Sequence, residues 1–289
     1  MTRFWRWLLP AFVLLCGAAH AAENVQLPSL DQSLTATGQP TSLLGVLYKP
    51  DGAGPFPAIV MLHGCGGLFN AKTGRPDARS VWWAEYFQQH GYVALMIDSF
   101  KSRNASVMCP HGAPTILPDR ERPLDTYGAL RYLQQQPFVM ADRIGLIGWS
   151  HGGGTLLYSI DAQSPARPAD LQHDFRAAVA FYPGWCNARA HGWRWHTQIP
   201  LLVLLGESDN WVHAPPCQSF IEGSRANGTQ ADVVVYPDTY HDFDWPRLVE
   251  HTIANFSGRG PDHIVAPNPA AAADAQARVL AFFDHNLKN

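Results

Sequence analysis

The sequence has no surplus of positive charge, no internal repeat and no linker-like stretch in its middle. Its 289 residues include 21 lysines and arginines against 24 aspartates and glutamates, which gives a formal net charge of −3. Nucleic acid is therefore an unfavoured partner. Hydrophobic residues make up 46% of the chain, enough for a sizeable core. In the absence of a linker or a repeat, we expect one domain over residues 22–289.

A hydrophobic run long enough to span a membrane is also missing. The apolar stretch LLPAFVLLCGAA at residues 8–19 is shorter than the ~20 residues that a bilayer requires, and it contains Pro10. It follows two arginines and ends in AHA at residues 19–21, a pattern typical of a secretory signal peptide, with a membrane anchor as the alternative. We expect residues 1–21 to be removed, which changes the formal net charge to −5 because two arginines are lost. The mature protein is then secreted or periplasmic, without stable membrane insertion.

Cysteine is scarce, and one of the five, Cys16, lies in the predicted signal peptide. The remaining cysteines have no zinc-binding spacing, so the sequence predicts no metal site. They are Cys65, Cys109, Cys186 and Cys217. An even number of cysteines in an oxidising compartment can form disulfides, and free buried thiols are the alternative.

Short apolar runs alternate with helical stretches along almost the whole mature chain. The runs are apolar on both faces, as in the middle of a parallel sheet. They occupy residues 58–64, 92–98, 144–150, 177–183, 200–206 and 231–237. Helices are predicted at residues 78–91, 124–136, 151–160, 214–228 and 270–289. This alternation predicts an α/β fold, a mostly parallel sheet with helices on both faces, and residues 41–50 are expected to add an antiparallel edge.

The sequence GWSHGGG at residues 148–154 places a serine at a strand-to-helix turn. Gly148 and Gly152 flank Ser150 two residues away on either side, the Gly-x-Ser-x-Gly pattern of a nucleophile elbow. Such a turn exposes the hydroxyl and sets the amide of His151 at a helix start, where it can stabilise an oxyanion. The alternatives are an ordinary glycine-rich helix start and a phosphate loop, although the Lys-Ser/Thr pair of a phosphate loop does not follow.

A serine hydroxyl needs a base to take its proton and an acid to orient that base. In this architecture the chain order is serine, acid, histidine, with each residue at the carboxyl end of a strand. Asp209 and His241 follow two successive predicted strands, so we assign them as the acid and the general base. Glu207 and Asp242 are the competing acids, and a solvated loop histidine is the alternative interpretation of His241.

The sequence HGCGG at residues 63–67 follows an early predicted strand. This is the expected place of the second oxyanion donor, which we assign to the backbone amide of Cys65. The neighbouring glycines allow a close approach of the main chain. The ring of His63 is expected to brace the loop, and His151 to contribute its amide and not its ring.

The motifs MLHGCGG, IDSF, DRIGLIGWSHGG, FYPG, GESDNWV and YHDFD occur in this order between residues 44 and 284. Through them the chain resembles the dienelactone hydrolase family. The resemblance implies an α/β-hydrolase fold and a carboxylic ester hydrolase of the Ser/Cys-His-Asp type, with no metal and no organic cofactor. Carried over residue by residue, the family's nucleophile falls on Ser150, its acid on Asp209 and its base on His241.

Two departures from the family pattern affect the expected substrate. The enzymes that gave the family its name have a cysteine nucleophile where this chain has Ser150. They also use a glutamate from an early strand to activate that cysteine, and residues 41–50, TSLLGVLYKP, contain no acid. Dienelactone is therefore a disfavoured substrate, and a serine with a histidine base points to a more general esterase.

The usual strand order of this fold makes two disulfide pairings geometrically feasible. They are Cys65 with Cys109 and Cys186 with Cys217, although four cysteines allow three connectivities. Tryptophans also gather in loops expected at the catalytic edge, where they either wall an apolar pocket or roof the core. These are Trp185, Trp193, Trp195 and Trp211.

The sequence thus predicts a serine esterase that acts on a small-molecule ester through an acyl-enzyme intermediate. A serine peptidase with the same triad and a non-catalytic binding protein on the same scaffold are the alternatives. The sequence leaves the oligomeric state and the acyl preference open.

Overall fold

The structure is a computed structural model, and it describes residues 22–105, 107–109, 115–255 and 261–289. The predicted signal peptide, residues 1–21, lies outside the described residues. Within the described part, no helix combines the length and the hydropathy that crossing a bilayer would require.

An eight-stranded sheet forms the centre of the protein, in the order β1-β2-β4-β3-β5-β6-β7-β8. Strands β3 to β8 run parallel, and β1 and β2 add the expected antiparallel edge, with β2 pairing against β4. The predicted mostly parallel sheet is therefore confirmed. The strands are β1 (Glu23–Pro28), β2 (Ser42–Tyr48), β3 (Phe56–Leu62), β4 (Val93–Asp98), β5 (Val139–Trp149), β6 (Ala177–Phe181), β7 (Leu201–Gly206) and β8 (Ala231–Tyr236).

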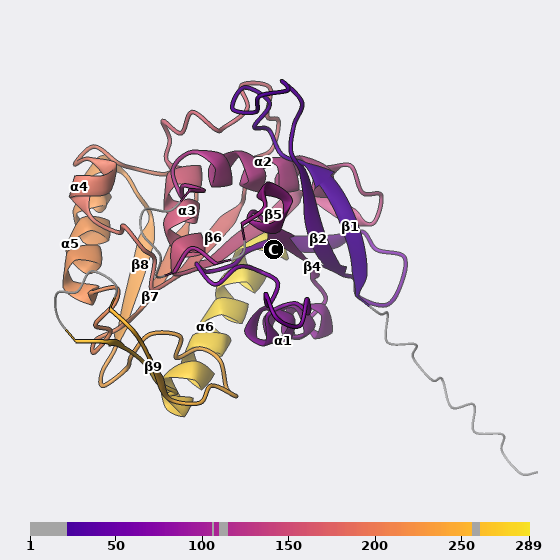
Figure 1. Ribbon diagram of the computed structural model, residues 1–289. Helices are drawn as coiled ribbons and strands as arrows, with labels where there is room; N and C mark the ends of the chain where they lie inside the picture. The colour runs from indigo at the N-terminus through magenta and orange to yellow at the C-terminus, as the bar shows by residue number, and fades with distance from the viewer. Residues whose placement is uncertain (1–21, 106, 110–114, 256–260) are drawn as a thin grey trace, which may run out of the picture.

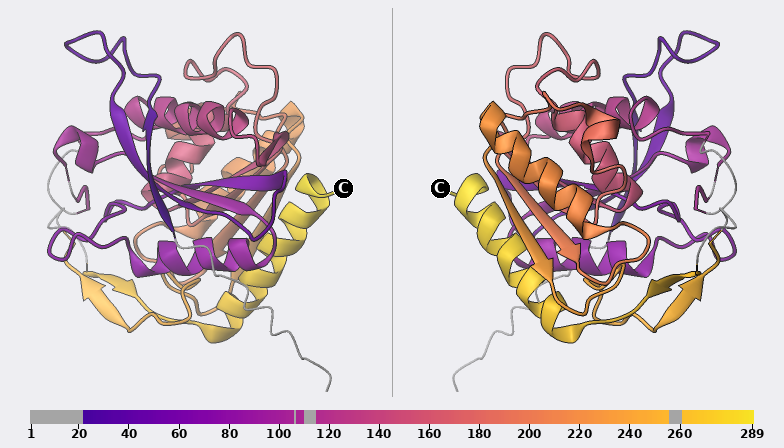
Figure 2. Two further views of the ribbon diagram at one scale, coloured as in Figure 1. Left: turned by 90° about the vertical axis from the view of Figure 1, so that its right-hand side faces the viewer. Right: turned by 90° about the vertical axis from the view of Figure 1, so that its left-hand side faces the viewer.

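Helices cover both faces of this sheet, as the sequence predicts (Figures 1 and 2). Helices α1 and α6 pack on one face, and α2, α3 and α5 pack on the other. The helices are α1 (Ala78–Gln89), α2 (Glu121–Gln134), α3 (His151–Ile160), α4 (Ala188–His191), α5 (Ala214–Ser224) and α6 (Pro269–Leu287), with 3₁₀ turns at η1 (Lys101–Arg103) and η2 (Arg225–Asn227). The short α4 lies in a segment that the sequence pattern predicts as loop.

Each central strand contributes alternate residues to two hydrophobic cores, one on each face of the sheet. In β3, Ile59 and Met61 join the core under α1 and α6, whereas Val60 and Leu62 join the core under α2 and α3. Because side chains alternate along a strand, a strand buried on both faces must be apolar at every position. This explains the uninterrupted apolar runs of the sequence, and the two cores hold the carboxyl ends of the strands in fixed positions.

A small β-hairpin extends from the long segment between β8 and α6. Its strands are β9 (His251–Ile253) and β10 (His263–Val265), which pair with each other and form a sheet of their own. Figure 2 shows the hairpin at the lower edge of the molecule, joined by a loop to the N-terminal end of α6. An isolated bridge between Val265 and His241 joins it to the loop after β8. The hairpin therefore lies beside the predicted general base.

Candidate active site

The turn between β5 and α3 has the geometry of a nucleophile elbow. Ser150 adopts φ 51° and ψ −113°, a backbone conformation that non-glycine residues rarely take. A Cβ on Gly148 would lie 2.4 Å from the carbonyl oxygen of Gly152, and a Cβ on Gly152 would lie 2.2 Å from the carbonyl oxygen of Leu62. Both distances are far below van der Waals contact, so only glycine fits at these two positions.

Hydrogen bonds to the backbone fix Ser150 in this turn. Its amide donates to the carbonyl of Phe181 at 3.0 Å, at the end of the neighbouring strand β6. Its carbonyl accepts from the amides of Gly154 and Gly184, each at 2.9 Å. The side chain of Ser150 lines a pocket of about 490 Å³ at the carboxyl edge of the sheet. The predicted nucleophile is therefore held rigidly and faces a cavity.

His241, the predicted base, lines the same pocket and is oriented by Asp209. Its Nδ1 donates to Oδ2 of Asp209 at 2.6 Å, and both side chains are buried. The other carboxylate oxygen, Oδ1, accepts from the amides of Trp211 at 2.8 Å and Val212 at 2.9 Å. With Nδ1 carrying the proton, the remaining ring nitrogen Nε2 is left as the proton acceptor. The structure thus places Ser150 and His241 in the lining of one pocket, with Asp209 bonded to the far side of the His241 ring.

The environment of His241 favours its protonated form. Burial of the ring lowers the pKa, but the charge of Asp209 and its hydrogen bond to Nδ1 outweigh burial, and the net shift is upward from 6.5. A base with a raised pKa takes a proton more readily and holds the imidazolium that forms.

The two competing acids are engaged elsewhere. Glu207 is exposed to solvent. Asp242 forms an ion pair with Arg79, and Arg79 also donates to the hydroxyl of Tyr182 at 2.8 Å. The ion pair with Arg79 lowers the pKa of Asp242 against the opposing effect of burial. Neither carboxylate orients the imidazole of His241.

The amides of Cys65 and His151 stay the predicted oxyanion donors. Cys65 lines the pocket together with Gly64, Gly66 and Gly67. Among the described residues, no acceptor is bonded to the amide of Cys65. His151 is the first residue of α3, so its amide has no carbonyl within the helix to bond. Both amides are therefore available to an oxygen that develops negative charge.

The ring of His63 braces the Cys65 loop, as expected. Its Nδ1 donates to the carbonyl of Gly64 at 2.7 Å, and its Nε2 accepts from the amide of Ser99 at 3.2 Å. Burial and the nearby charge of Arg122 hold the pKa of His63 well below its usual range. The ring is neutral, and both its nitrogens are used in structural bonds.

Arg122, a residue that the sequence analysis missed, connects the two oxyanion loops. Its guanidinium is fully buried; Nη2 donates to the carbonyl of His63 at 2.8 Å and Nη1 to Nδ1 of His151 at 2.6 Å. Burial and this cation lower the pKa of His151 to about 2, so the ring is neutral. No sequence signal separates Arg122 from a surface arginine, because its partners lie 29 and 59 positions away.

A second network, also missed, anchors the loop that carries His241. Asp244 is buried and accepts from Nε1 of Trp83 at 2.7 Å and Nε1 of Trp149 at 2.9 Å, as well as from the hydroxyl of Tyr182. Together with the Asp242–Arg79 ion pair, these bonds fix the residues that follow the base.

The tryptophans do not form one cluster. Trp211 lines the pocket, and its ring lies 5.0 Å from the ring of His241. Trp195 is buried and donates to the carbonyl of Leu157 at 3.2 Å, so it roofs the core. Trp193 is 82% exposed. Trp185, Trp193 and Trp195 are not among the residues that line this pocket, so the pocket-wall interpretation is wrong for them. Trp195 packs instead against Leu157 of α3 and Phe220 of α5.

Both feasible disulfides are present. Cys65 is bonded to Cys109 and Cys186 to Cys217, with Cα–Cα distances of 5.0 and 4.7 Å. Within the described part of the chain, no group of three or more His, Cys, Asp and Glu side chains is arranged to hold a metal ion.

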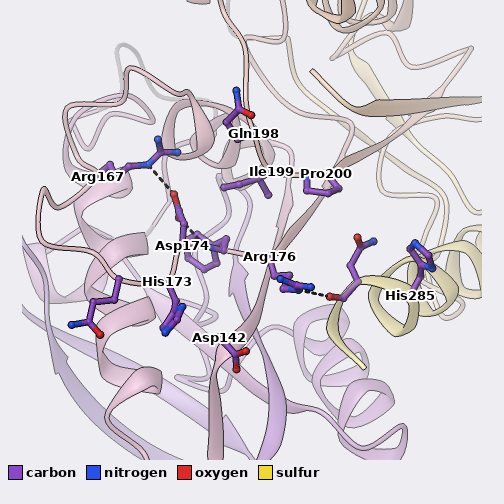
Figure 3. Close-up of a pocket in the computed structure, with 12 residues that line it drawn as sticks. Asp142, Arg167, His173, Asp174, Arg176, Gln198, Ile199, Pro200 and His285 are labelled. Atoms are coloured by element: carbon purple, nitrogen blue, oxygen red, sulfur yellow. Dashed lines mark hydrogen bonds and ion pairs between the residues drawn. The ribbon is translucent and has the colours of Figure 1, made fainter. Parts of the chain in front are cut away.

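A larger cavity, of about 650 Å³, lies at the opposite edge of the sheet (Figure 3). Asp142 near the start of β5, Pro200 before β7 and His285 near the end of α6 line it. An ion pair between Arg167 and Asp174 crosses its wall. Its lining contains no serine or cysteine. The smaller cavity, with Ser150, is therefore the candidate active site.

Comparisons with known proteins bear on the family and the fold of the chain. The sequence model of the dienelactone hydrolase family matches residues 43–287. The chain belongs to the dienelactone hydrolase family. A relative from Bradyrhizobium sp., named "Probable 2-oxo-3-(5-oxofuran-2-ylidene)propanoate lactonase", is 25% identical over 215 residues, covering 70% of this chain and 79% of its own.

Solved structures share the fold of this dienelactone hydrolase family member. A dienelactone hydrolase-like promiscuous phosphotriesterase from metagenomic libraries has a TM-score of 0.66 and 20% identity, with 92% of this chain and 99% of the other covered. Esterase 2 of Thermogutta terrifontis, phosphorylated by paraoxon, has a TM-score of 0.63 and 20% identity, with 93% and 95% covered. The protein is an α/β-hydrolase, and its family supports hydrolysis as the reaction class.

Proposed function

We propose that this protein is a carboxylic ester hydrolase that uses Ser150 as its nucleophile. The observation that carries the proposal is the hydrogen bond of 2.6 Å between Asp209 and His241, on the rim of the pocket that Ser150 lines. A serine, an imidazole and a buried carboxylate in this order form a nucleophilic triad.

In the first half of the proposed reaction, the hydroxyl of Ser150 attacks the ester carbonyl while Nε2 of His241 takes its proton. Asp209 stabilises the imidazolium and keeps the ring in the tautomer that accepts at Nε2. The carbonyl oxygen becomes an oxyanion, which accepts hydrogen bonds from the amides of Cys65 and His151. Collapse of this intermediate transfers the proton to the leaving alcohol and leaves an acyl group on Ser150.

In the second half, water repeats the sequence with the acyl-enzyme. His241 takes a proton from the water, the hydroxide attacks the acyl carbonyl, and the same two amides hold the second oxyanion. The proton returns to Ser150 as the acid product leaves. No step calls for a metal or an organic cofactor.

The proposed substrate is a small-molecule ester, and lactones belong to this class because they are cyclic esters. One relative is named a probable lactonase, which supports the inclusion of lactones among the proposed substrates. Strand β2 (Ser42–Tyr48) carries no acidic residue that could activate a cysteine-type nucleophile. A histidine-activated serine does not need one, which supports a general esterase over an enzyme dedicated to dienelactone.

We further propose that the mature protein acts outside the cytoplasm, secreted or in a periplasm. Two disulfides support this, since such bonds persist in oxidising compartments. Detection of the mature N-terminus in the extracellular or periplasmic fraction of the expressing cell tests the proposal, and retention of residues 1–21 in the cytoplasmic fraction contradicts it.

The decisive experiment compares Ser150→Ala with Ser219→Ala, a matched change at an exposed position on α5. Hydrolysis of p-nitrophenyl acetate and stoichiometric labelling by a fluorophosphonate should both be lost in the first variant and kept in the second. Labelling that persists in Ser150→Ala refutes the assignment. Wild-type protein that neither turns over esters nor takes the label indicates a non-catalytic scaffold. Cleavage of peptide amides at rates above ester hydrolysis indicates a peptidase.

A further inference from the structure

The amide donor of Cys65 lies in a loop that has little intrinsic rigidity. Glycine precedes Cys65 and two glycines follow it, and glycine restricts the backbone less than any other residue. A Cβ placed on Gly66 would meet nothing within 4 Å, and Gly67 has φ 82°. Within the loop, the amide of Gly67 donates to the carbonyl of Gly64 at 3.2 Å, which closes a turn around Cys65 and Gly66.

Three further bonds join Cys65 itself to one short segment. The side chain of Cys65 is covalently bonded to Cys109. Its carbonyl accepts from the amides of Met108 at 2.7 Å and Cys109 at 3.3 Å. Because the side chain and the carbonyl are attached to the same Cα, holding both fixes the position of the amide nitrogen of Cys65, and the direction of its N–H then depends on the peptide plane. On its other side, the ring of His63 holds the carbonyl of Gly64, in the same peptide unit as that amide.

The two disulfides of the protein differ in their surroundings. Cys65 and Cys109 are partly exposed, and both line the pocket. Cys186 is 4% exposed and Cys217 fully buried, and both belong to the hydrophobic core under α2, α3 and α5. A reductant in solvent therefore reaches the bond at the active site before it reaches the bond in the core.

We propose that the Cys65–Cys109 disulfide is a positioning bond for the oxyanion hole, so that its reduction reversibly slows the esterase without unfolding it. The inference rests on the proposed function. Cys109 acts through Cys65 and touches no reacting atom in this proposal. A thiol reductant supplies the two electrons: its thiolate attacks one sulfur and forms a mixed disulfide, and a second thiol releases the reductant as its own disulfide. Cys65 and Cys109 each gain one proton.

The test compares Cys109→Ser with Cys186→Ser, which breaks the core disulfide. Loss of one oxyanion donor lowers kcat by about 10²–10³ in enzymes of this type, so a loosened donor should lower kcat by roughly 10- to 100-fold. We expect this fall in kcat for Cys109→Ser with p-nitrophenyl acetate as substrate, while KM changes less than about threefold. Its Tm should fall less than the Tm of Cys186→Ser. Cys186→Ser should lose more Tm and keep its kcat. The double variant Cys65→Ser/Cys109→Ser excludes an effect of the freed Cys65 thiol.

Titration of the wild-type enzyme with a dithiol gives a second measurement that does not depend on folding of a variant. After alkylation, mass spectrometry shows which cysteines are free at each stage. The fall in kcat should follow labelling of Cys65 and Cys109, precede labelling of Cys186, and reverse on reoxidation.

A Cys109→Ser enzyme with kcat within twofold of wild type refutes the inference, as does full activity of selectively reduced enzyme. Both outcomes leave the proposed function intact. Wild-type protein that fails to hydrolyse esters instead refutes the proposed function itself.

Discussion

Replacing Asp209 with asparagine tests the orientation of the general base. The new side chain has almost the same shape, and its oxygen can still accept from the amides of Trp211 and Val212, as Oδ1 does now. Its NH₂ group then faces Nδ1 of His241, where the carboxylate oxygen lies at 2.6 Å. An NH₂ can only donate, so Nδ1 must accept, and the ring proton moves to Nε2.

With its proton on Nε2, His241 cannot take the proton of Ser150. The equivalent change in a well-studied serine protease lowers kcat about 10⁴-fold, which corresponds to about 5.4 kcal/mol of transition-state stabilisation. We expect a loss of this order for Asp209→Asn. Burial lowers the pKa of His241 and the charge of Asp209 raises it, so the pKa of His241 should fall when this charge is lost.

The assay is kcat/KM for p-nitrophenyl acetate at several pH values, with Glu207→Gln as the matched control. Glu207 is the exposed carboxylate two residues before Asp209, and its loss should change kcat less than about twofold. If Asp209→Asn keeps more than about a tenth of the wild-type kcat, the carboxylate does not set the tautomer, and the reasoning from the hydrogen bond is wrong.

Three further predictions concern the pH profile, the elbow and the buried arginine. Activity requires neutral His241, so kcat/KM should rise with pH through a pKa above 6.5 and be lost below it; a profile flat from pH 5 to 8 would contradict this base. Gly152→Ala should lower the free energy of unfolding in urea by about 3 kcal/mol or more, because its Cβ would lie 2.2 Å from a carbonyl oxygen. The control Gly66→Ala places its Cβ in open space and should stay within ~1 kcal/mol of wild type. Equal stability of the two glycine variants would be inconsistent with the elbow geometry. Arg122→Met leaves two buried acceptors unpaired, at about 1–3 kcal/mol each, and should lower both Tm and kcat. An Arg122→Met variant with wild-type kcat would show that the cation does not hold the oxyanion loops.

The sheet and the positions of the candidate site residues could be predicted because short stretches of sequence determine them. The glycines around Ser150 follow from the steric demands of one turn, and the places of Asp209 and His241 follow from the rule that ligands bind at the carboxyl ends of parallel strands. The sheet and its helical layers follow from the periodicity of apolar residues. These signals need no knowledge of distant contacts.

The supporting residues could not be predicted, since their roles depend on partners far away in the chain. Arg79 pairs with Asp242, 163 positions away, and Asp244 accepts from Trp83, 161 positions away. A charged residue in a helix has the same local pattern whether it faces solvent or a buried partner. The prediction for Trp193 was wrong for a related reason: a reversal of the chain at a four-residue helix leaves no periodic signal in the sequence.

The separate pairing of β9 and β10 has a consequence for how this enzyme could diversify. The hairpin supplies Ile253 to the pocket wall, yet neither of its strands belongs to the central sheet. Replacements at that wall position would change the room in the pocket while every strand of the central sheet keeps its neighbours. A mutagenesis library aimed at Ile253 can therefore alter the pocket and leave the pairing of the central strands unchanged.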